Sequence, residues 1–232
     1  MITVITPTTG KQSLFLSIES LKRQNTNRKI NHIVIWDNKR EGEFLFPTKD
    51  METSDPFSIE CNTDNYSCQC IVLKGNYVLG NAKGSALRAI GLMAANTDWV
   101  TFMDDDVMWD KDHLESIMNA VKDTEWGFSK RKIWTPEGEG FRCIGIDEFE
   151  SVGEEAKTDY KMVDNNSMVF KAKYGYSAAC MYRNTTQYND DRLMYKFLME
   201  YGGTPAKSEK ATVNQICPKK LIKFFEDNCT KE

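Results

Sequence analysis

The sequence predicts an α/β fold with a mostly parallel central sheet flanked by helices. Short apolar segments with strand character alternate with amphipathic helical patterns through the first half of the chain. Such alternation is typical of strands that are joined by helical crossovers and therefore run parallel. Polar clusters follow three of the segments, at residues 6–10, 37–38 and 104–106. Because ligands of parallel sheets bind outside the carboxyl ends of the strands, these clusters indicate one common site.

The elements of the first half follow in order along the chain. Four apolar segments predict strands, at residues 2–5, 33–36, 71–73 and 99–103. Apolar residues at helical spacing predict helices, the first through Leu14, Leu16, Ile18 and Leu21 and the others at residues 81–96 and 112–121. Residues 39–67 are polar and contain two prolines, so we expect a long connection there.

The second half changes character, because glycines divide it into short pieces. A strand is expected at residues 126–129, strand-like pieces at 141–146 and 162–170, and a further apolar run covers 176–181. A long helix is expected at residues 190–201, where Gly202, Gly203 and Pro205 end it.

Composition excludes several classes of protein. The chain has 232 residues, 41% of them hydrophobic, which is enough for one sizeable core. Its formal charge is −4 and it has no basic block, so nucleic acid is not expected as a partner. The seven cysteines lack zinc-site spacing and are expected to be reduced. Without a secretory signal or a membrane-spanning run, we expect a cytoplasmic location, with membrane association through a partner left open.

Three consecutive carboxylates stand at the exit of the fourth predicted strand: Asp104, Asp105 and Asp106, the aspartate triplet. Carboxylates this close repel one another unless a cation or hydrogen-bond donors compensate them. Clusters of hard oxygen ligands suit Mg²⁺ or Mn²⁺. The triplet therefore indicates a metal site, although a solvated acidic turn has the same sequence.

Four short motifs follow one another along the chain, at residues 4–8, 33–38, 80–91 and 101–106. Their order resembles that of family 2 glycosyltransferases with the GT-A (nucleotide-diphospho-sugar transferase) fold. A fifth, Asn189 and Asp190 followed by Leu193, Lys196 and Gly202, is similar to the late Glu-Asp helix signature of the family. The sequence departs from the family pattern at three positions, namely Asn189 in place of Glu, Lys196 in place of Arg and Ala89 in place of Asn.

The resemblance covers residues 2–203 and implies a division of the chain. We expect a single domain over residues 1–232, with a nucleotide-binding half at 1–106 and an acceptor-side half at 107–205. Residues 206–232 are expected to form a C-terminal extension.

The resemblance also implies a role for each member of the triplet. Asp106 would ligate Mn²⁺ or Mg²⁺, and Asp104 would face the ribose or a water bound to the metal. Asp105 would lie near the transferred sugar. A register in which Asp105 is the principal ligand stays open.

The nucleotide would bind to the other two polar clusters and to the helix before the triplet. Asp37 would accept an N–H of the base beside Thr6, Pro7 and Thr8, although a strand-ending cap is an equally ordinary role for it. Lys83 and Arg88 lie about one helical turn apart and would meet the base or the phosphates. The alternative role for both residues is that of ordinary solvated charges on a helix.

Sugar transfer with inversion needs a base that takes the proton of the acceptor hydroxyl. By its position in the late helix signature, Asp190 is the expected base and Asp191 its nearest competitor. A simple carboxylate at a helix N-terminus is the structural alternative.

Several other residues are candidates for the same site. The polar segment at residues 164–168 resembles one that touches sugar or acceptor in the family, and a turn capped by Asn side chains is the alternative. Trp109 and Trp134 are candidate platforms for sugar faces, with core packing as the commoner role. His113 is placed in the core or on the surface rather than at the metal.

Together these expectations describe a metal-dependent, inverting glycosyltransferase. Its donor would be a nucleotide diphosphate sugar, with a UDP-sugar favoured, and its acceptor a hydroxyl of a glycan or of a lipid-linked or protein-linked acceptor. Two alternatives remain: a sugar-phosphate nucleotidyltransferase, although only Gly10 follows the first strand where a glycine-rich loop is expected, and a catalytically inactive nucleotide-sugar-binding module.

Overall fold

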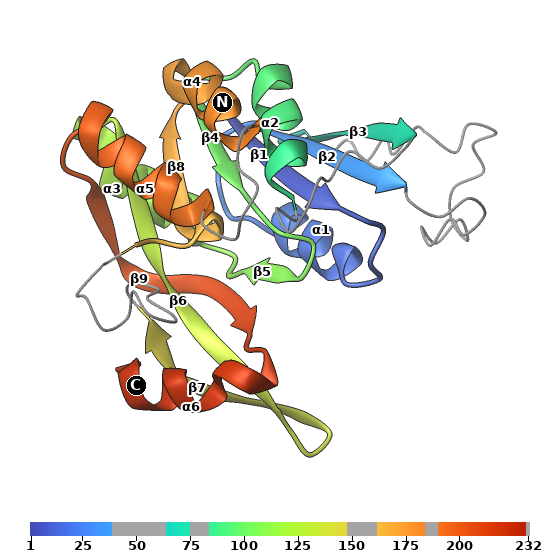
Figure 1. The fold of residues 1–232 in the computed structure, drawn as a ribbon, viewed down its shortest axis with the longest axis vertical. Coiled ribbons are helices and arrows are strands. Elements are labelled where there is room, and N and C mark those ends of the chain that lie inside the picture. The colour runs from blue at the N-terminus through green and yellow to red at the C-terminus, as the bar shows by residue number, and fades with distance from the viewer. Residues whose placement is uncertain (39–63, 75–83, 148–161, 184–189, 231–232) are drawn as a thin grey trace.

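The protein is described from a computed structural model. The description covers residues 1–38, 64–74, 84–147, 162–183 and 190–230. These residues form one nine-stranded sheet with helices packed on both of its faces (Figure 1). The predicted α/β fold is confirmed.

The strands join in the order β3-β2-β1-β4-β8-β6-β9-β5, and β7 pairs with β6 at the side. Their bounds are β1 Ile2–Thr8, β2 Ile30–Asn38, β3 Tyr66–Lys74, β4 Trp99–Phe102, β5 Val107–Trp109, β6 Trp126–Glu137, β7 Gly140–Asp147, β8 Met168–Lys171 and β9 Ala206–Ile216.

The sheet is parallel at one end and mixed at the other. β3, β2, β1 and β4 run parallel to one another, whereas β8 is antiparallel to both β4 and β6. β9 is parallel to β6 and antiparallel to β5, and β7 forms an antiparallel hairpin with β6. The sheet is mostly parallel, as expected, since β5, β7 and β8 run against the direction shared by the other strands. The carboxyl ends of β1, β2 and β4 consequently share one edge.

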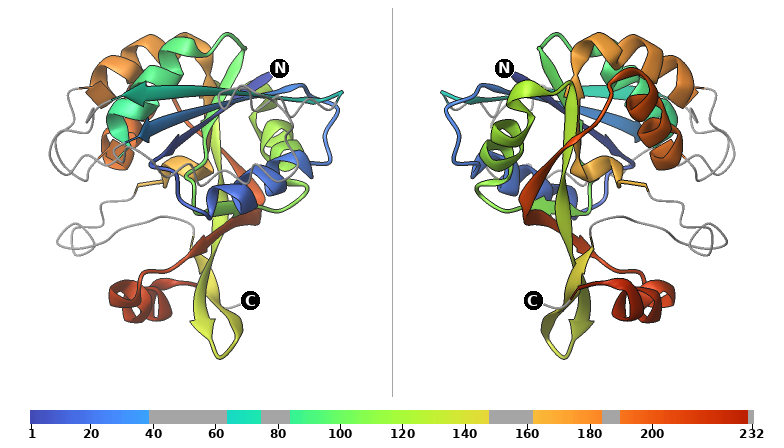
Figure 2. Two further views of the ribbon diagram at one scale, coloured as in Figure 1. Left: turned by 90° about the vertical axis from the view of Figure 1, so that its right-hand side faces the viewer. Right: turned by 90° about the vertical axis from the view of Figure 1, so that its left-hand side faces the viewer.

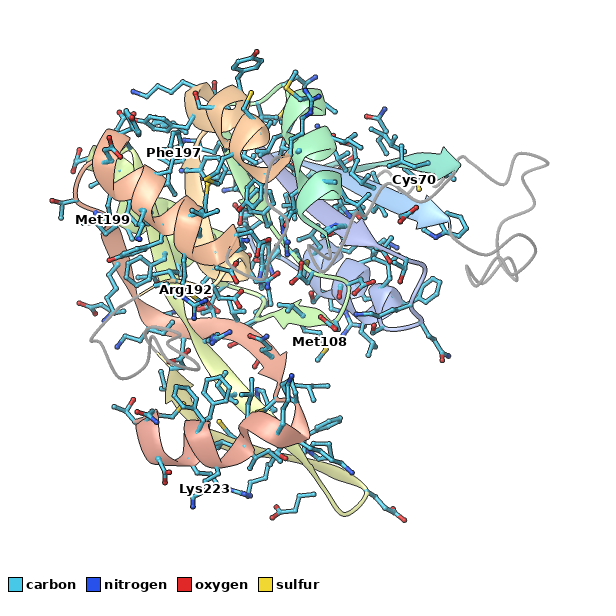
Figure 3. The ribbon with its side chains drawn as sticks, in the orientation of Figure 1. Cys70, Met108, Arg192, Phe197, Met199 and Lys223 are labelled. Carbon is cyan, nitrogen blue, oxygen red and sulfur yellow. The ribbon has the colours of Figure 1, made fainter. Side chains whose placement is uncertain are left out.

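Two groups of helices cover the two faces (Figure 2). The helix bounds are α1 Leu14–Lys22, α2 Ser85–Ala94, α3 His113–Ala120, α4 Gly175–Arg183, α5 Asp190–Tyr201 and α6 Ile222–Asn228. Short 3₁₀ turns are η2 Val121–Asp123, η4 Asn165–Ser167, η5 Ala172–Tyr174 and η6 Lys219–Leu221. α1 and α3 share a core with Ile2 and Val4 of β1, while α2, α4 and α5 share the other core with Ile5. Side chains fill the space between the helices and the sheet (Figure 3).

Several elements differ from the sequence expectation. β1 continues to Thr8, and all seven of its residues are buried, as in a central strand. Leu16 lies on the outer side of α1 and is 58% exposed, because Leu14, Ile18 and Leu21 form the buried face with Ser17. The apolar run at residues 176–181 belongs to α4, since Ala178, Ala179 and Tyr182 are buried at helical spacing.

The expected C-terminal extension contributes a strand to the sheet. β9 pairs with β6 from Gly127 to Trp134 and with β5, so residues 206–216 are part of the central sheet. Below the main body, α6 packs on β7 (Figure 1). Its small core contains Ile133, Ile144, Cys217 and Phe225. Among the helices that the structure describes, none combines the length and the apolar character that crossing a membrane requires.

Gly91 permits the contact between α2 and β1. A Cβ atom at this position would lie 2.3 Å from Cγ2 of Ile5, which is fully buried. We expect Gly91→Ala to destabilise the protein by about 1–3 kcal/mol through overpacking. At this chain length the midpoint of thermal unfolding should fall by roughly 2–12 °C. Gly140→Ala is the control, because its Cβ would meet no atom closer than 3.9 Å; an equal loss in both variants would contradict the packing explanation.

Candidate active site

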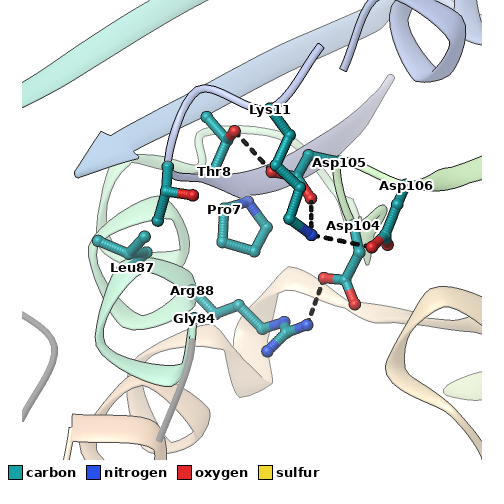
Figure 4. A pocket seen from close by; sticks show the side chains of 10 residues that line it. Pro7, Thr8, Lys11, Gly84, Leu87, Arg88, Asp104, Asp105 and Asp106 are labelled. Atoms are coloured by element: carbon teal, nitrogen blue, oxygen red, sulfur yellow. Dashed lines mark hydrogen bonds and ion pairs between the residues drawn. The ribbon is translucent and has the colours of Figure 1, made fainter. Parts of the chain in front are cut away.

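A cavity of about 380 Å³ opens at the edge of the sheet where β1 and β4 end (Figure 4). Three segments form it: the end of β1 with the loop after it, the start of α2, and the loop after β4. The lining residues are Pro7, Thr8, Thr9, Lys11, Gly84, Leu87, Arg88, Asp104, Asp105 and Asp106. Polar residues that follow two different parallel strands thus meet in one place.

The aspartate triplet forms a tight turn between β4 and β5. The backbone N–H of Val107 donates to the carbonyl of Asp104 at 3.2 Å. From α1, Ser17 Oγ donates to the carbonyl of Val107 at 2.7 Å and so fixes the turn to the helix. Asp105 is 4% exposed, whereas the Asp106 side chain is 54% exposed. The three carboxylates therefore have different environments.

Lys11 bridges two members of the triplet. Its Nζ lies 2.9 Å from Oδ1 of Asp105 and 2.9 Å from Oδ2 of Asp106. Thr8 Oγ1 donates to the other oxygen of Asp105 at 2.7 Å. Burial lowers the pKa of Lys11, but its hydrogen bonds and its charge interactions with the two aspartates outweigh this effect and raise the pKa above its ordinary value. The Lys11 ammonium group therefore stays protonated and contributes a positive charge to the cavity.

Sequence reasoning missed Lys11. A single lysine after a glycine forms no periodic pattern, and its only signal is its place beside the polar cluster at residues 6–10. Gly10 turns the chain there with a φ of +87°, a conformation that favours glycine. Its N–H donates to Thr8 Oγ1 at 2.9 Å, which brings Lys11 back over the end of β1.

Arg88 joins the triplet to the start of α5. Its Nη2 donates to Oδ1 of Asp104, and its Nη1 donates to Oδ2 of Asp190 at 3.0 Å. Ser85 Oγ donates to the same oxygen of Asp190 at 3.0 Å. The Arg88 side chain is 7% exposed, and Gly84 makes room for it, since a Cβ there would lie 3.2 Å from Nη1. One guanidinium thus holds two carboxylates that are 86 residues apart in sequence (190 minus 104).

A second layer of hydrogen bonds supports Asp104. Asn166 on η4 accepts the backbone N–H of Asp104, and its Nδ2 donates to Asp104 Oδ2 at 3.1 Å and to Asp164 Oδ1 at 2.7 Å. Arg131 on β6 donates to the other oxygen of Asp164 at 2.8 Å. Burial raises the pKa of Asp104 above its ordinary value, although the Arg88 guanidinium lowers it. The polar segment at residues 164–167 is therefore a capped turn that also contacts the triplet.

Two of the predicted nucleotide-binding residues, Thr6 and Asp37, are not in the cavity. Thr6 is buried in the core, where its Oγ1 lies 2.8 Å from Nε2 of His32; burial lowers the pKa of that histidine to about 3, so it is neutral. Asp37 is fully buried at the end of β2 and is not part of the cavity lining. Lys83 lies outside the described residues. The other predicted nucleotide-binding residues do line the cavity: Pro7, Thr8, Arg88, Asp104 and Asp105.

The two candidate bases point to different partners. Asp190 accepts the hydrogen bonds of Arg88 and Ser85 through Oδ2. Asp191 Oδ1 accepts the backbone N–H of Asn165 at 3.0 Å, which ties α5 to η4. Of the two, Asp190 is the residue linked to the triplet.

The remaining candidates lie away from the cavity. His113 Nδ1 is 2.8 Å from Thr212 Oγ1, and the ring of Trp109 lies 4.1 Å from the His113 ring, centroid to centroid. Burial lowers the pKa of His113 to about 3, which fits a neutral core histidine. Trp109 and Trp134 both line a separate groove between α1 and the strands β5, β6, β7 and β9. Neither tryptophan contributes to the cavity at the triplet.

The triplet fits a divalent cation through one carboxylate. In the part of the chain that the structure describes, no three acidic, histidine or cysteine side chains converge on one point. All three carboxylates accept hydrogen bonds from neighbouring side chains, but Asp106 is half-exposed, and its partner Lys11 is itself half-exposed. Mg²⁺ is usually held by one or two carboxylates together with substrate phosphates and waters. The donor chemistry of Asp106 suits this arrangement.

Comparison with protein families decides the class of the protein. The sequence model described as Glycosyl transferase family 2 matches residues 3–183, more than half of the chain. The chain belongs to glycosyl transferase family 2. The family resemblance and the enzyme class predicted from the motifs are thereby confirmed. No curated protein matches the sequence.

Solved structures confirm the fold. The chain is similar to S. aureus TarS 1-349, with a TM-score of 0.59 and 14% identity, over 93% of this chain and 60% of that one. For S. aureus TarS the TM-score is 0.59 and the identity 15%, over 100% of this chain and 40% of that one. For TarS 1-349 in complex with UDP-GlcNAc the TM-score is 0.60 and the identity 14%, over 94% and 59%. The chain therefore spans less than two thirds of these relatives.

Proposed function

We propose that this family 2 protein is a metal-dependent, inverting glycosyltransferase that moves a sugar from a nucleotide diphosphate sugar to a hydroxyl of a glycan or related acceptor. The observation that carries the proposal is the bridge from Asp104 through Arg88 to Asp190. Inversion needs the base and the leaving group on opposite faces of the anomeric carbon. The bridge supports this arrangement, because it holds the proposed base close to the proposed donor site.

The charges that line the cavity support a divalent cation. Two positive side chains, Lys11 and Arg88, stand against the three carboxylates of the triplet, which leaves one negative charge in excess. A nucleotide diphosphate adds more negative charge, and like charges this close repel one another. Mn²⁺ or Mg²⁺ bound at Asp106 would offset two of these negative charges and stabilise the charge that develops on the departing diphosphate.

Uridine diphosphate is the nucleotide that we propose for the donor. One neighbouring structure is S. aureus TarS 1-349 in complex with UDP, and another holds UDP-GlcNAc. In this chain Pro7 and Thr8 line the cavity, and the register sets Thr8 beside Trp36, one residue before Asp37. Asp37 remains our proposed acceptor of a base N–H, a role that requires its buried carboxylate to become accessible when the donor binds. A sugar of unassigned identity would extend from the diphosphate toward Asp190.

The proposed reaction is a direct displacement. The acceptor hydroxyl oxygen forms a bond to the anomeric carbon while the bond from that carbon to the diphosphate oxygen breaks, and the nucleoside diphosphate leaves with the bonding electrons. Asp190 takes the hydroxyl proton. Among the described residues, Ser85 and Arg88 bond only to Oδ2 of Asp190, so Oδ1 is the oxygen that we assign to the proton. Arg88 holds the carboxylate in place during the step.

The acceptor and the location are proposed from the family alone. Glycans and lipid-linked or protein-linked acceptors offer the hydroxyl that the reaction needs. We propose a cytoplasmic site of action, with association to a membrane through a partner.

Asp106→Asn tests the proposed metal site. In the wild type, Mn²⁺ should strengthen UDP binding, because the cation contacts both the carboxylate and the diphosphate; a coupling of about 5- to 150-fold is typical of linked sites. In Asp106→Asn this gain should be lost. Isothermal titration calorimetry with UDP, with and without Mn²⁺, measures it.

The matched control is Asp112→Asn, which changes a carboxylate that pairs with Lys210 away from the cavity. It should keep the full response to Mn²⁺. An unchanged response in Asp106→Asn would remove Asp106 as the proposed ligand.

A further inference from the structure

Lys11 occupies the place between two carboxylate oxygens that a cation takes at an acidic cluster. Figure 4 shows its ammonium group between Asp105 and Asp106, and both N···O distances are 2.9 Å. Asp106 is also the carboxylate that we propose as the metal ligand. A lysine ammonium and a divalent cation on one carboxylate would repel each other at close range. The two cations cannot both be accommodated there without a rearrangement.

The two cationic side chains of the cavity differ in their freedom to move. Arg88 is 7% exposed and is bonded to Asp104 and Asp190, so its departure would leave two partly buried carboxylates without a cation. The Lys11 side chain is 52% exposed, and its four-carbon stem is flexible. If Lys11 leaves, Asp105 keeps its hydrogen bond from Thr8 and Asp106 remains half-exposed. Lys11 is therefore the more mobile of the two cations, and its release leaves the buried Asp105 carboxylate to Thr8 and to the incoming divalent cation.

We infer that Lys11 is a displaceable counter-cation, which holds Asp105 and Asp106 while the donor site is empty and moves to the donor diphosphate when a divalent cation takes Asp106. This inference rests on the proposed function. The diphosphate gives the released ammonium a new partner of opposite charge. Cation and donor consequently favour each other's binding through Lys11 as well as through direct contact. In the absence of donor, Lys11 competes for the carboxylate and weakens the binding of metal alone.

The test is a titration of Mn²⁺ without nucleotide, in which the electron paramagnetic resonance signal of free Mn²⁺ reports how much is bound. The full-length wild type is compared with Lys11→Met, which keeps the length of the side chain and removes its charge. We expect Lys11→Met to bind Mn²⁺ about tenfold more tightly, within the range usual for coupled sites. Adding Asp106→Asn to Lys11→Met should abolish that gain. UDP titrated without Mn²⁺ should bind more weakly to Lys11→Met than to the wild type.

Lys210→Met is the matched control, since Lys210 also pairs with one aspartate, Asp112, at the surface outside the cavity. It should bind Mn²⁺ and UDP as the wild type does. Lys11→Arg keeps the charge and should show no gain in Mn²⁺ affinity, which separates loss of charge from a change in folding.

Two results would overturn the inference. In the first, Lys11→Met binds Mn²⁺ no more tightly than the wild type, or not measurably. In the second, Lys210→Met gains as much Mn²⁺ affinity as Lys11→Met does. If Mn²⁺ still strengthens UDP binding in the wild type, the proposed function survives that failure. A wild type that binds no UDP under any condition counts instead against the proposed function, whatever Lys11→Met does to Mn²⁺.

Discussion

Asp190→Asn is expected to reduce sugar transfer by about 10²- to 10⁴-fold, the usual contribution of a general base. The amide has the shape of the carboxylate and can still accept hydrogen bonds from Ser85 and Arg88, but it cannot take a proton at neutral pH. Binding of UDP should therefore change little. The measurement is the rate of UDP release from a UDP-sugar with water as the acceptor, together with the dissociation constant of UDP.

Asp191→Asn is the comparison for this prediction. The Asp191 carboxylate accepts the N–H of Asn165, so its loss should weaken the contact between α5 and η4 and have a smaller effect on the rate. A full rate in Asp190→Asn with a severe loss in Asp191→Asn would exchange the roles of the two residues.

Arg88→Met is expected to have the largest effect on stability. It removes the cation between Asp104 and Asp190 and leaves two carboxylates without compensation in a site where Arg88 is nearly buried. Removal of one partner from a buried ion pair typically costs about 3–5 kcal/mol. For a chain of this size the midpoint of thermal unfolding should fall by roughly 6–20 °C. The midpoint should fall less in Arg88→Lys, because lysine keeps the charge but has no planar group that could bridge both carboxylates.

The loss in Arg88→Met should depend on pH. Burial raises the pKa of Asp104, and Arg88 is the interaction that opposes this effect, so its removal raises the pKa further. A carboxyl group whose pKa is raised on folding stabilises the folded state below its unfolded pKa, and that contribution is lost as the pH rises through the folded pKa. The deficit of Arg88→Met relative to wild type should therefore shrink as the pH falls through the acidic range. A deficit independent of pH would contradict this assignment.

A double-mutant cycle separates the charge effect from packing. If Arg88 acts by compensating Asp190, then adding Asp190→Asn to Arg88→Met should cost less than the sum of the two single losses. Strictly additive losses would show that the bridge contributes no coupling energy.

Regular elements with one strong period were predictable from the sequence. α5 begins at Asp190 and ends at Tyr201, as expected, because two glycines follow its apolar pattern. The strands before the polar clusters were predictable because each is a short apolar segment that polar residues end. The length of β6 was not predictable, since beyond Ser129 its buried residues, which alternate with half-buried ones, include the polar Arg131 and Thr135. Its partner β9 is likewise polar in sequence, and pairing between distant strands supplies its order.

The site was predictable where residue type and strand end coincide. The triplet follows β4, and Pro7 and Thr8 end β1. Because these two strands are parallel neighbours, the sequence was sufficient to bring the residues into one cavity. Thr6 was misplaced because side chains alternate along a strand, and its neighbours face the other way. Contacts of Lys11 and of Asn166 depend on loop geometry and on tertiary packing, for which a single sequence has no periodic signal.

Phosphorus NMR of a reaction with a UDP-sugar tests the central claim most directly. The full-length protein is incubated with Mn²⁺ and, in turn, each of several UDP-sugars, and the phosphorus signals are followed over time. The account predicts that UDP appears with both of its phosphorus atoms still joined, and that Asp190→Asn suppresses its appearance. Formation of UTP and sugar phosphate when pyrophosphate is added would contradict it, as would donors that bind but stay intact throughout.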